Sequence, residues 1–329
     1  MMTALLVLTV LLGGCAVVNL IKPGQTGHRR SVYVLTALNL CFVTGFFWIC
    51  YLHYSIYRHL PLEISQQTAD WINYHLAALN RKSAFAMPLY DTGHIPRYTL
   101  PLWIENEKYF FWFMCYALAA LVTHIRSRHV RLNAIIALLL VPQSVILVAA
   151  ADPFSTPLPG FFSEIAPWFK SGMPAAGQIG LFMRLYPRLV FYYNAVYMWL
   201  HPPMLFISYA CITIMFAACL VMLFDHSPTV ERTAYESAKP GFILLTVGML
   251  FGYPWALQAW GPNWWWDPKI CSSIIMWAVY GAYLHSRLYL HRSGMWKLTS
   301  ALGILCFATL ILTVLTSYYF PGQHTFQAP

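Results

Sequence analysis

The sequence predicts an all-α polytopic membrane protein with about eight transmembrane helices. Apolar residues make up 59% of the 329-residue chain and charged residues only 9%, against about 45–50% and about 25% in soluble domains. The apolar residues gather in segments near the length of about 20 residues that a bilayer requires. Lysine and arginine concentrate in every second loop between these segments, as they do in cytoplasmic loops.

The predicted spans follow from hydropathy and length along the chain. The first has no basic residue before its apolar stretch, whereas Lys22, Arg29 and Arg30 follow it. This order favours an uncleaved span with its N-terminus outside. The eight predicted spans are residues 2–21, 31–53, 109–125, 133–151, 203–224, 240–258, 271–289 and 299–319.

The basic residues orient these spans. Four alternate loops hold 11 of the 20 lysines and arginines in 44 residues, so this set faces the cytoplasm. The four loops are residues 22–30, 125–132, 225–239 and 287–298. Both termini, the segments 54–108 and 152–200, and the loop 258–270 then lie on the outer face. The membrane is expected to be a bacterial or archaeal cytoplasmic membrane, or an organelle membrane of similar origin.

The chain is expected to form one membrane domain in two parts. Residues 1–189 are a four-span region with outer segments 54–108 and 152–189, and residues 190–329 are a core that carries the loop 260–269. The expected surroundings are the lipid bilayer and no nucleic acid, because 20 basic residues in this length are too sparse to follow phosphates. Eight cysteines include no C-x-x-C pair, which excludes a thiol-disulfide motif.

Tryptophan marks the most unusual loop. Residues 260–266 hold four of the chain's 13 tryptophans, namely Trp260, Trp264, Trp265 and Trp266, together with glycine and proline. Tryptophan also gathers at membrane interfaces, and an aromatic belt is the alternative interpretation. The dense packing of rings beside Asp267 favours a rigid aromatic platform, which suits a large planar cofactor.

This loop resembles a known signature. The motif Trp260-Gly-x-x-Trp264-x-Trp266-Asp267-Pro-Lys269 is similar to the tryptophan-rich motif of the cytochrome c assembly family, of the CcsA, CcmF and CcmC type. Members of that family are haem-handling membrane proteins. The resemblance covers roughly residues 190–326, whereas Trp103 and His201-Pro-Pro look more like the CcmF branch. It implies haem b as the substrate of an outer-face site carried by the loops.

Two histidines match the external haem-ligand positions of the family. His201 precedes Pro202 and Pro203, which predicts a fixed place at the start of the fifth span, since proline is favoured in a first helical turn. His324 follows the eighth span on the same face. We expect both imidazoles to hold the haem iron, as metal ligands with a catalytic role.

His285 is expected inside the bilayer, where ionisable groups face the bundle interior and mark a functional path. The resemblance assigns this position to a second, intramembrane haem. The sequence leaves the opposing ligand open between a histidine of a CcsB-like membrane partner and His124, at the inner end of the third span. His53 closes the second span at the outer face.

The resemblance implies covalent attachment of haem to the C-x-x-C-H segment of an apocytochrome c, as a haem lyase or holocytochrome c synthase component. The four tryptophans would hold the porphyrin. Asp267 and Lys269 would orient the loop or meet a propionate, and Arg184 and Arg188 are further propionate candidates. Two alternatives stay open: a transporter that hands haem to a chaperone, and a b-type electron-transfer subunit of a quinone-linked complex.

Overall fold

The computed structural model describes residues 1–82, 86–170 and 173–324. The gaps fall in the predicted outer segments 54–108 and 152–189, and residues 325–329 of the predicted core also lie outside the described residues. Within these ranges the chain is helical, with one isolated β-bridge between Pro61 and Arg97. The α-helices are α1 (Met2–Ile21), α2 (Gln25–His59), α3 (Gln66–Asn80), α4 (Glu107–Arg126), α5 (Val130–Ala150), α6 (Pro159–Ile165), α7 (Ala175–Arg188), α8 (Tyr197–Met222), α9 (Pro228–Trp260), α10 (Pro268–Arg287) and α11 (Met295–Tyr319).

The predicted all-α membrane fold is confirmed. Among the described residues, seven helices are long and apolar enough to cross a bilayer: α1, α2, α4, α5, α8, α9 and α11. The remaining predicted span, residues 271–289, corresponds to α10. This helix has 20 residues and packs in the same bundle, but it is not one of the seven.

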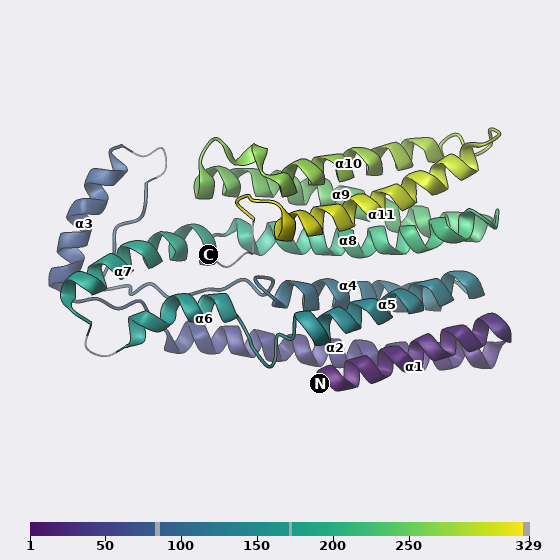
Figure 1. Ribbon diagram of the computed structural model, residues 1–329, viewed down its shortest axis with the longest axis horizontal. Helices are drawn as coiled ribbons and strands as arrows, with labels where there is room; N and C mark the ends of the chain where they lie inside the picture. The colour runs from purple at the N-terminus through teal and green to yellow at the C-terminus, as the bar shows by residue number, and fades with distance from the viewer. Residues whose placement is uncertain (83–85, 171–172, 325–329) are drawn as a thin grey trace.

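The long helices form a bundle in two groups (Figure 1). The first group consists of α1, α2, α4 and α5, in which both α1 and α4 pack against α2 and α5. The second group consists of α8, α9, α10 and α11, in which α8 packs against α9 and α11, and α10 packs against α11. The contact between α4 and α8 joins the groups. A continuous apolar core runs through both, so the bundle is one body rather than two.

A second apolar core lies at one end of the bundle, where α3, α6 and α7 gather (Figure 1). Polar side chains fix the loops there. Asn194 accepts one hydrogen bond from the backbone N–H of Thr99, at 2.9 Å, and donates one to the carbonyl of Arg97, at 2.8 Å. These bonds hold the segment before α4 against the segment before α8, so the two helices that join the groups start from fixed positions.

Glu105 fixes the start of α6. Its carboxylate accepts hydrogen bonds from the backbone N–H groups of Gly160 and Phe161, at 2.8 and 2.7 Å. The first N–H groups of a helix have no partner within the helix, so an acceptor there stabilises it. Glu105 itself takes a φ of 47°, which orients its side chain across the loop.

We expect Glu105→Ala to lower the free energy of unfolding by about 1–2 kcal/mol, because two N–H groups of α6 lose their acceptor. The thermal unfolding midpoint of the purified protein in detergent measures this. Glu63, an exposed carboxylate of the same end of the molecule, provides the control variant Glu63→Ala. Equal midpoints for the two variants would contradict the capping role.

Candidate functional site

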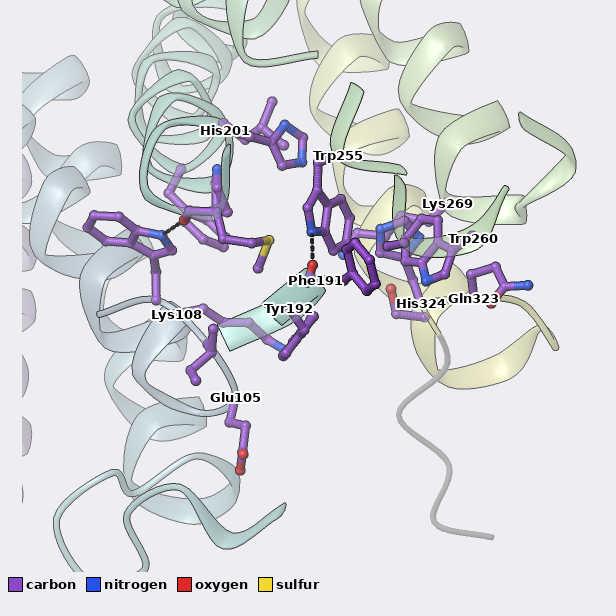
Figure 2. Close-up of a pocket in the computed structure, with 18 of the residues that line it drawn as sticks. Glu105, Lys108, Phe191, Tyr192, His201, Trp255, Trp260, Lys269, Gln323 and His324 are labelled. Carbon is purple, nitrogen blue, oxygen red and sulfur yellow. Dashed lines mark hydrogen bonds between the residues drawn. The ribbon is translucent and has the colours of Figure 1, made fainter. Parts of the chain in front are cut away.

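A cavity of about 600 Å³ opens at the end of the bundle that carries the second core. This volume is in the range of small-molecule and cofactor sites. Helices α4, α7, α8, α9 and α10 and the segment after α11 contribute to its wall, so residues distant in the sequence meet there (Figure 2). The wall combines large aromatic side chains with a few basic residues and both His201 and His324.

His201 is held by the backbone of α9. Its Nδ1 lies 2.6 Å from the carbonyl oxygen of Gly248. Because a carbonyl can only accept, Nδ1 carries the proton and Nε2 keeps a free lone pair. A side chain at Gly252 would place its Cβ 2.6 Å from Cε1 of this imidazole, closer than real contacts allow. Glycine at residue 252 therefore provides the space that the His201 ring occupies.

The predicted place of His201 at the helix entrance was wrong by one turn. Helix α8 begins at Tyr197, so Pro202 and Pro203 lie beyond the first turn. Proline has no N–H, and at residue 202 it leaves the carbonyl of Met198 without its helical donor. The indole N–H of Trp103 takes that place, at 2.5 Å from the Met198 oxygen. This bond lets the helix extend past the prolines.

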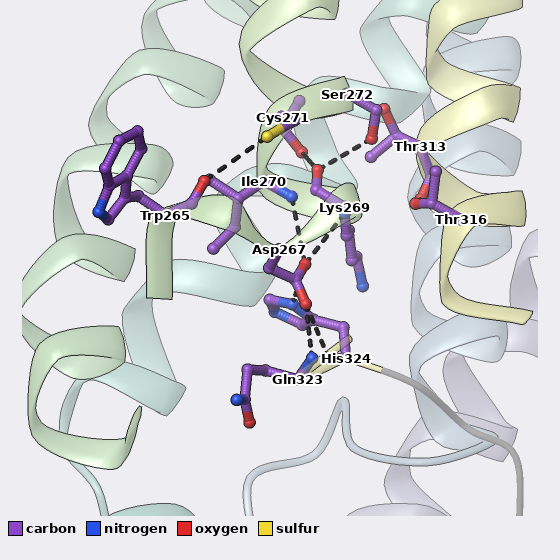
Figure 3. A network of polar contacts seen from close by, with 11 residues as sticks. Trp265, Asp267, Lys269, Ile270, Cys271, Ser272, Thr313, Thr316, Gln323 and His324 are labelled. Atoms are coloured by element: carbon purple, nitrogen blue, oxygen red, sulfur yellow. Dashed lines mark hydrogen bonds and ion pairs between the residues drawn. The ribbon is translucent and has the colours of Figure 1, made fainter. Parts of the chain in front are cut away.

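Asp267 positions His324. Its Oδ1 lies 2.9 Å from Nδ1 of His324, and its Oδ2 accepts hydrogen bonds from the backbone N–H groups of Gln323 and His324, at 2.7 and 3.2 Å (Figure 3). The same carboxylate caps α10 by accepting from the amides of Lys269 and Ile270. One side chain therefore starts α10 and orients the imidazole of His324, whose Nε2 has no hydrogen-bond partner among the described residues.

Burial and hydrogen bonding set the charges of this pair. Burial raises the pKa of the Asp267 carboxyl, but the hydrogen bonds and charge of His324 outweigh this and lower the pKa to about 2. Burial lowers the pKa of the His324 imidazole, and its bond to Asp267 offsets that in part. At neutral pH the pair is a carboxylate and a neutral imidazole, which is the usual arrangement behind a metal-binding histidine.

The tryptophans of residues 260–266 separate into two groups. Trp260 lines the cavity and lies edge-on to His324, with ring centroids 4.7 Å apart. Trp264 packs against Tyr253 outside the lining. Trp265 and Trp266 stack on each other at 4.1 Å and are 48% and 69% exposed, away from the cavity. The structure therefore places only Trp260 of the four expected residues in the wall.

Trp255 takes the central position that the sequence did not assign. It is buried, donates a hydrogen bond from its indole to the Phe191 carbonyl at 3.0 Å, and lies beside both imidazoles (Figure 2). Its ring centroid is 6.3 Å from that of His201 and 6.4 Å from that of His324. Residue 255 falls inside the predicted span 240–258, five residues before the start of the tryptophan loop, and no pattern in the sequence distinguishes it from the other residues of that span.

Basic side chains form another part of the lining. The expected residues Lys269, Arg184 and Arg188 all contribute to it, and Arg188 also pairs with Glu164 at 2.9 Å. Lys108, at the start of α4, lines the cavity as well and was not predicted. With Glu105 as the acidic residue of this lining, the described wall carries a net positive charge, which suits an anionic ligand.

The structure does not bring His285 together with the other candidate ligands. His285 lies in the last turn of α10, about 24 Å along the helix from Lys269, and is exposed on the outside of the bundle. The expectation that it faces the bundle interior was wrong. His124 is buried beside His28, with ring centroids 6.5 Å apart. His53 is buried and bonds to the Leu100 carbonyl at 3.0 Å.

Comparison with known proteins gives the family. The family model described as "Cytochrome C assembly protein" matches residues 103–324, which include His201, the tryptophan loop and His324. The chain belongs to this family. The match therefore covers the helices that build the cavity and both of the imidazoles that line it.

Curated relatives match a shorter stretch. Cytochrome c biogenesis protein CcsA of Prochlorococcus marinus (strain NATL1A) is 48% identical over 65 residues, which is 20% of this chain and 21% of the relative. The protein of the same name from Synechococcus sp. (strain WH7803) is 48% identical over 65 residues, or 20% of each chain. The alignments thus span about a fifth of the length of these relatives. No solved structure matches the chain.

The lowered pKa of His324 predicts a pH dependence of stability. The unfolded imidazole titrates near pH 6.5, so on acidification the unfolded chain takes up this proton before the folded one does. The contribution of His324 is therefore complete above about pH 6.5 and decreases as the pH falls below it. We expect wild type to lose more thermal stability than His324→Gln between about pH 7.5 and about pH 5.5. Parallel pH profiles for the two proteins would show that burial does not lower this pKa.

Proposed function

We propose that the chain binds haem in the cavity through His201 and His324, at the outer face of the membrane, and attaches it covalently to an apocytochrome c with a C-x-x-C-H segment. One observation carries the proposal. Two imidazoles line one cavity, the Nδ1 of each is bound to an acceptor, and the Nε2 of neither has a hydrogen-bond partner within the described part of the chain. This is the form in which histidine ligates a metal such as haem iron.

The rest of the wall fits the same ligand. Haem is a flat apolar macrocycle with two carboxylates at one edge. Trp255 and Trp260 offer aromatic faces and edges beside the two imidazoles. Lys108, Lys269 and Arg184 line the same space and give this part of the wall basic character, which suits carboxylates. Trp265 and Trp266 have no part in this arrangement and suit an interfacial position instead.

The proposed reaction is thioether formation. Each cysteine S–H adds across one haem vinyl group, with sulfur bonding to the carbon next to the ring and hydrogen to the terminal carbon, so no electron is gained or lost. The protein contributes mainly by positioning. His201 and His324 hold the iron, and the histidine of the substrate segment replaces one of them. Asp267 and the Gly248 carbonyl keep both imidazoles in the ligating tautomer.

His285 suits a second haem site shared with another protein. Its exposure on α10 leaves it accessible from outside the bundle, whereas His124 is enclosed beside His28. This favours a histidine from a CcsB-like membrane partner over His124 as the opposing ligand. Such a haem would lie within the bilayer and serve as a transfer step or an electron path to the outer site.

The test is a visible spectrum and pyridine haemochrome of the purified protein, followed by co-expression with an apocytochrome c. We expect non-covalent, low-spin haem in wild type and covalent haem in the cytochrome. His201→Ala and His324→Ala should lose most of both, with recovery of the spectrum on addition of imidazole. His94→Ala, at an exposed loop position, is the control.

The outcomes separate the possible functions. Haem-free wild type, purified with haem supplied, would refute the proposal. Bound haem without any covalent product in the presence of the apocytochrome would leave transport to a chaperone as the function. Retention of full haem and activity in both histidine variants would place the ligands elsewhere.

Gly252→Ala tests the geometry around His201. The added methyl group would lie within van der Waals overlap of the imidazole, so the ring must move away from its bond with Gly248. We expect the outer-site haem content to fall strongly while the protein stays folded, because the loss is local. Gly281→Ala, where an added Cβ meets nothing closer than 3.8 Å, is the matched control and should retain wild-type haem. Equal haem content in both variants would contradict the role of residue 252.

A further inference from the structure

A second, larger cavity of about 1220 Å³ adjoins the first. It lies between α5 and α11, with α4 and α8 contributing Trp112 and Thr213 to its floor. In Figure 1, α5 and α11 run along the same side of the bundle, and α4 and α8 join the two groups behind them. The residues that line both cavities are Glu105, Lys108, Tyr109, Trp112, Arg184, Arg188, Tyr192 and Val314.

The apolar part of this cavity opens on the outside of the bundle. Ile146 of α5 is 45% exposed, and Ile311 and Leu315 of α11 are 38% and 41% exposed, although all three line the cavity. Both helices are long and apolar enough to cross a membrane. The mouth of the cavity therefore faces the lipid rather than water. We name this opening, between Ile146 and Ile311, the lateral mouth.

Polarity increases from the lateral mouth toward the first cavity. The wall at the mouth is aliphatic, and one turn along α5 from Ile146 it also includes Gln143, whose Oε1 is buried and finds no hydrogen-bond partner among the described residues. Where the two cavities meet, the wall carries Lys108, Arg184 and Arg188 together with Glu105, and Arg188 pairs with Glu164, so cations outnumber carboxylates there. A molecule with an apolar body and a carboxylate edge fits this gradient, because its charged edge finds cations at the inner end.

We propose that haem enters the site laterally from the bilayer through the mouth between Ile146 and Ile311. This inference rests on the proposed function and adds the route to it. Haem partitions into lipid, and its macrocycle can pass an aliphatic wall that would hinder a charged ligand. The eight residues that line both cavities connect this route to the cavity that holds His201 and His324.

An acyl chain of a phospholipid is the competing occupant of the same space. It would fill the aliphatic part equally well. An acyl chain, however, has no charged group to pair with the basic residues at the inner end and no metal for the two imidazoles to bind. The shared residues Lys108, Arg184 and Arg188 place positive charge on the path between the cavities rather than at the lipid surface. The observations therefore favour haem.

The experiment blocks the lateral mouth without touching the histidine site. Ile146→Trp and Ile311→Trp place an indole in the opening. Val145→Trp and Leu312→Trp change the neighbouring residues, which are 48% and 43% exposed and line neither cavity. Each protein is reconstituted into phosphatidylcholine vesicles that contain dissolved haemin, and the rate at which the low-spin haem spectrum appears is recorded.

We expect the two blocking variants to load haem several-fold more slowly than wild type, and the two controls to load at the wild-type rate. In detergent, with haemin added from the buffer, all five proteins should reach the same final haem content. That measurement shows that the blocking variants are folded and have an intact site.

Equal loading rates in vesicles would overturn the lateral route while leaving the haem site in place. A phospholipid found bound to wild type by native mass spectrometry and lost from the blocking variants, with haem loading unchanged, would assign the cavity to lipid and also overturn it. A wild type that binds no haem even in detergent would refute the proposed function itself.

Discussion

The position of the C-terminal imidazole depends on one buried carboxylate. Asp267 is 5% exposed and accepts hydrogen bonds from the first amides of α10, from two backbone amides after α11, and from His324. These groups lie more than 50 residues apart in the sequence. With its pKa held at about 2, the carboxylate stays ionised, and a charged acceptor makes stronger hydrogen bonds than a neutral one. Without it, the segment after α11 would lose its attachment to the cavity wall.

The other imidazole is fixed by a different means with the same chemical result. Close approach of α9 to α8, possible because residues 248 and 252 are glycine, brings a backbone carbonyl to Nδ1 of His201. In both cases the proton is kept on Nδ1 and the lone pair of Nε2 is left for a ligand. The acceptor is a carboxylate at His324, which lies in a loop, and a backbone carbonyl at His201, where α8 and α9 are in contact.

Much of this architecture was predictable from the sequence. The apolar segments followed from hydropathy. The expectation that His201, His324, Trp260 and Lys269 share one face followed from the predicted topology and the resemblance to the cytochrome c assembly family, and the structure does place those four around one cavity. Hydropathy could not give the start of α8, because the donor that replaces the Pro202 amide is Trp103, about a hundred residues away. A rule that considers only the residues next to proline cannot identify this distant hydrogen-bond donor.

Other features depend on tertiary packing in the same way. Trp255 lies inside a predicted span, and only the tertiary packing of α8, α9 and the segment after α11 shows that it reaches both histidines. Trp265 and Trp266 belong to the recognised motif, yet the short 3₁₀ turn of residues 264–266 directs them outward. A motif identifies which residues occur together, whereas the backbone path decides which of them share a wall.

The double role of Asp267 has a mechanical consequence. Helix α10 is a rigid rod about 30 Å long, with Asp267 at one end and His285 near the other. Because the carboxylate that caps α10 is also hydrogen-bonded to His324, a tilt or axial shift of α10 would move this imidazole with it. A displacement of the far end of α10, near His285, would therefore also move the imidazole of His324. In the proposed two-site scheme, one helix and one carboxylate would connect the two haem positions.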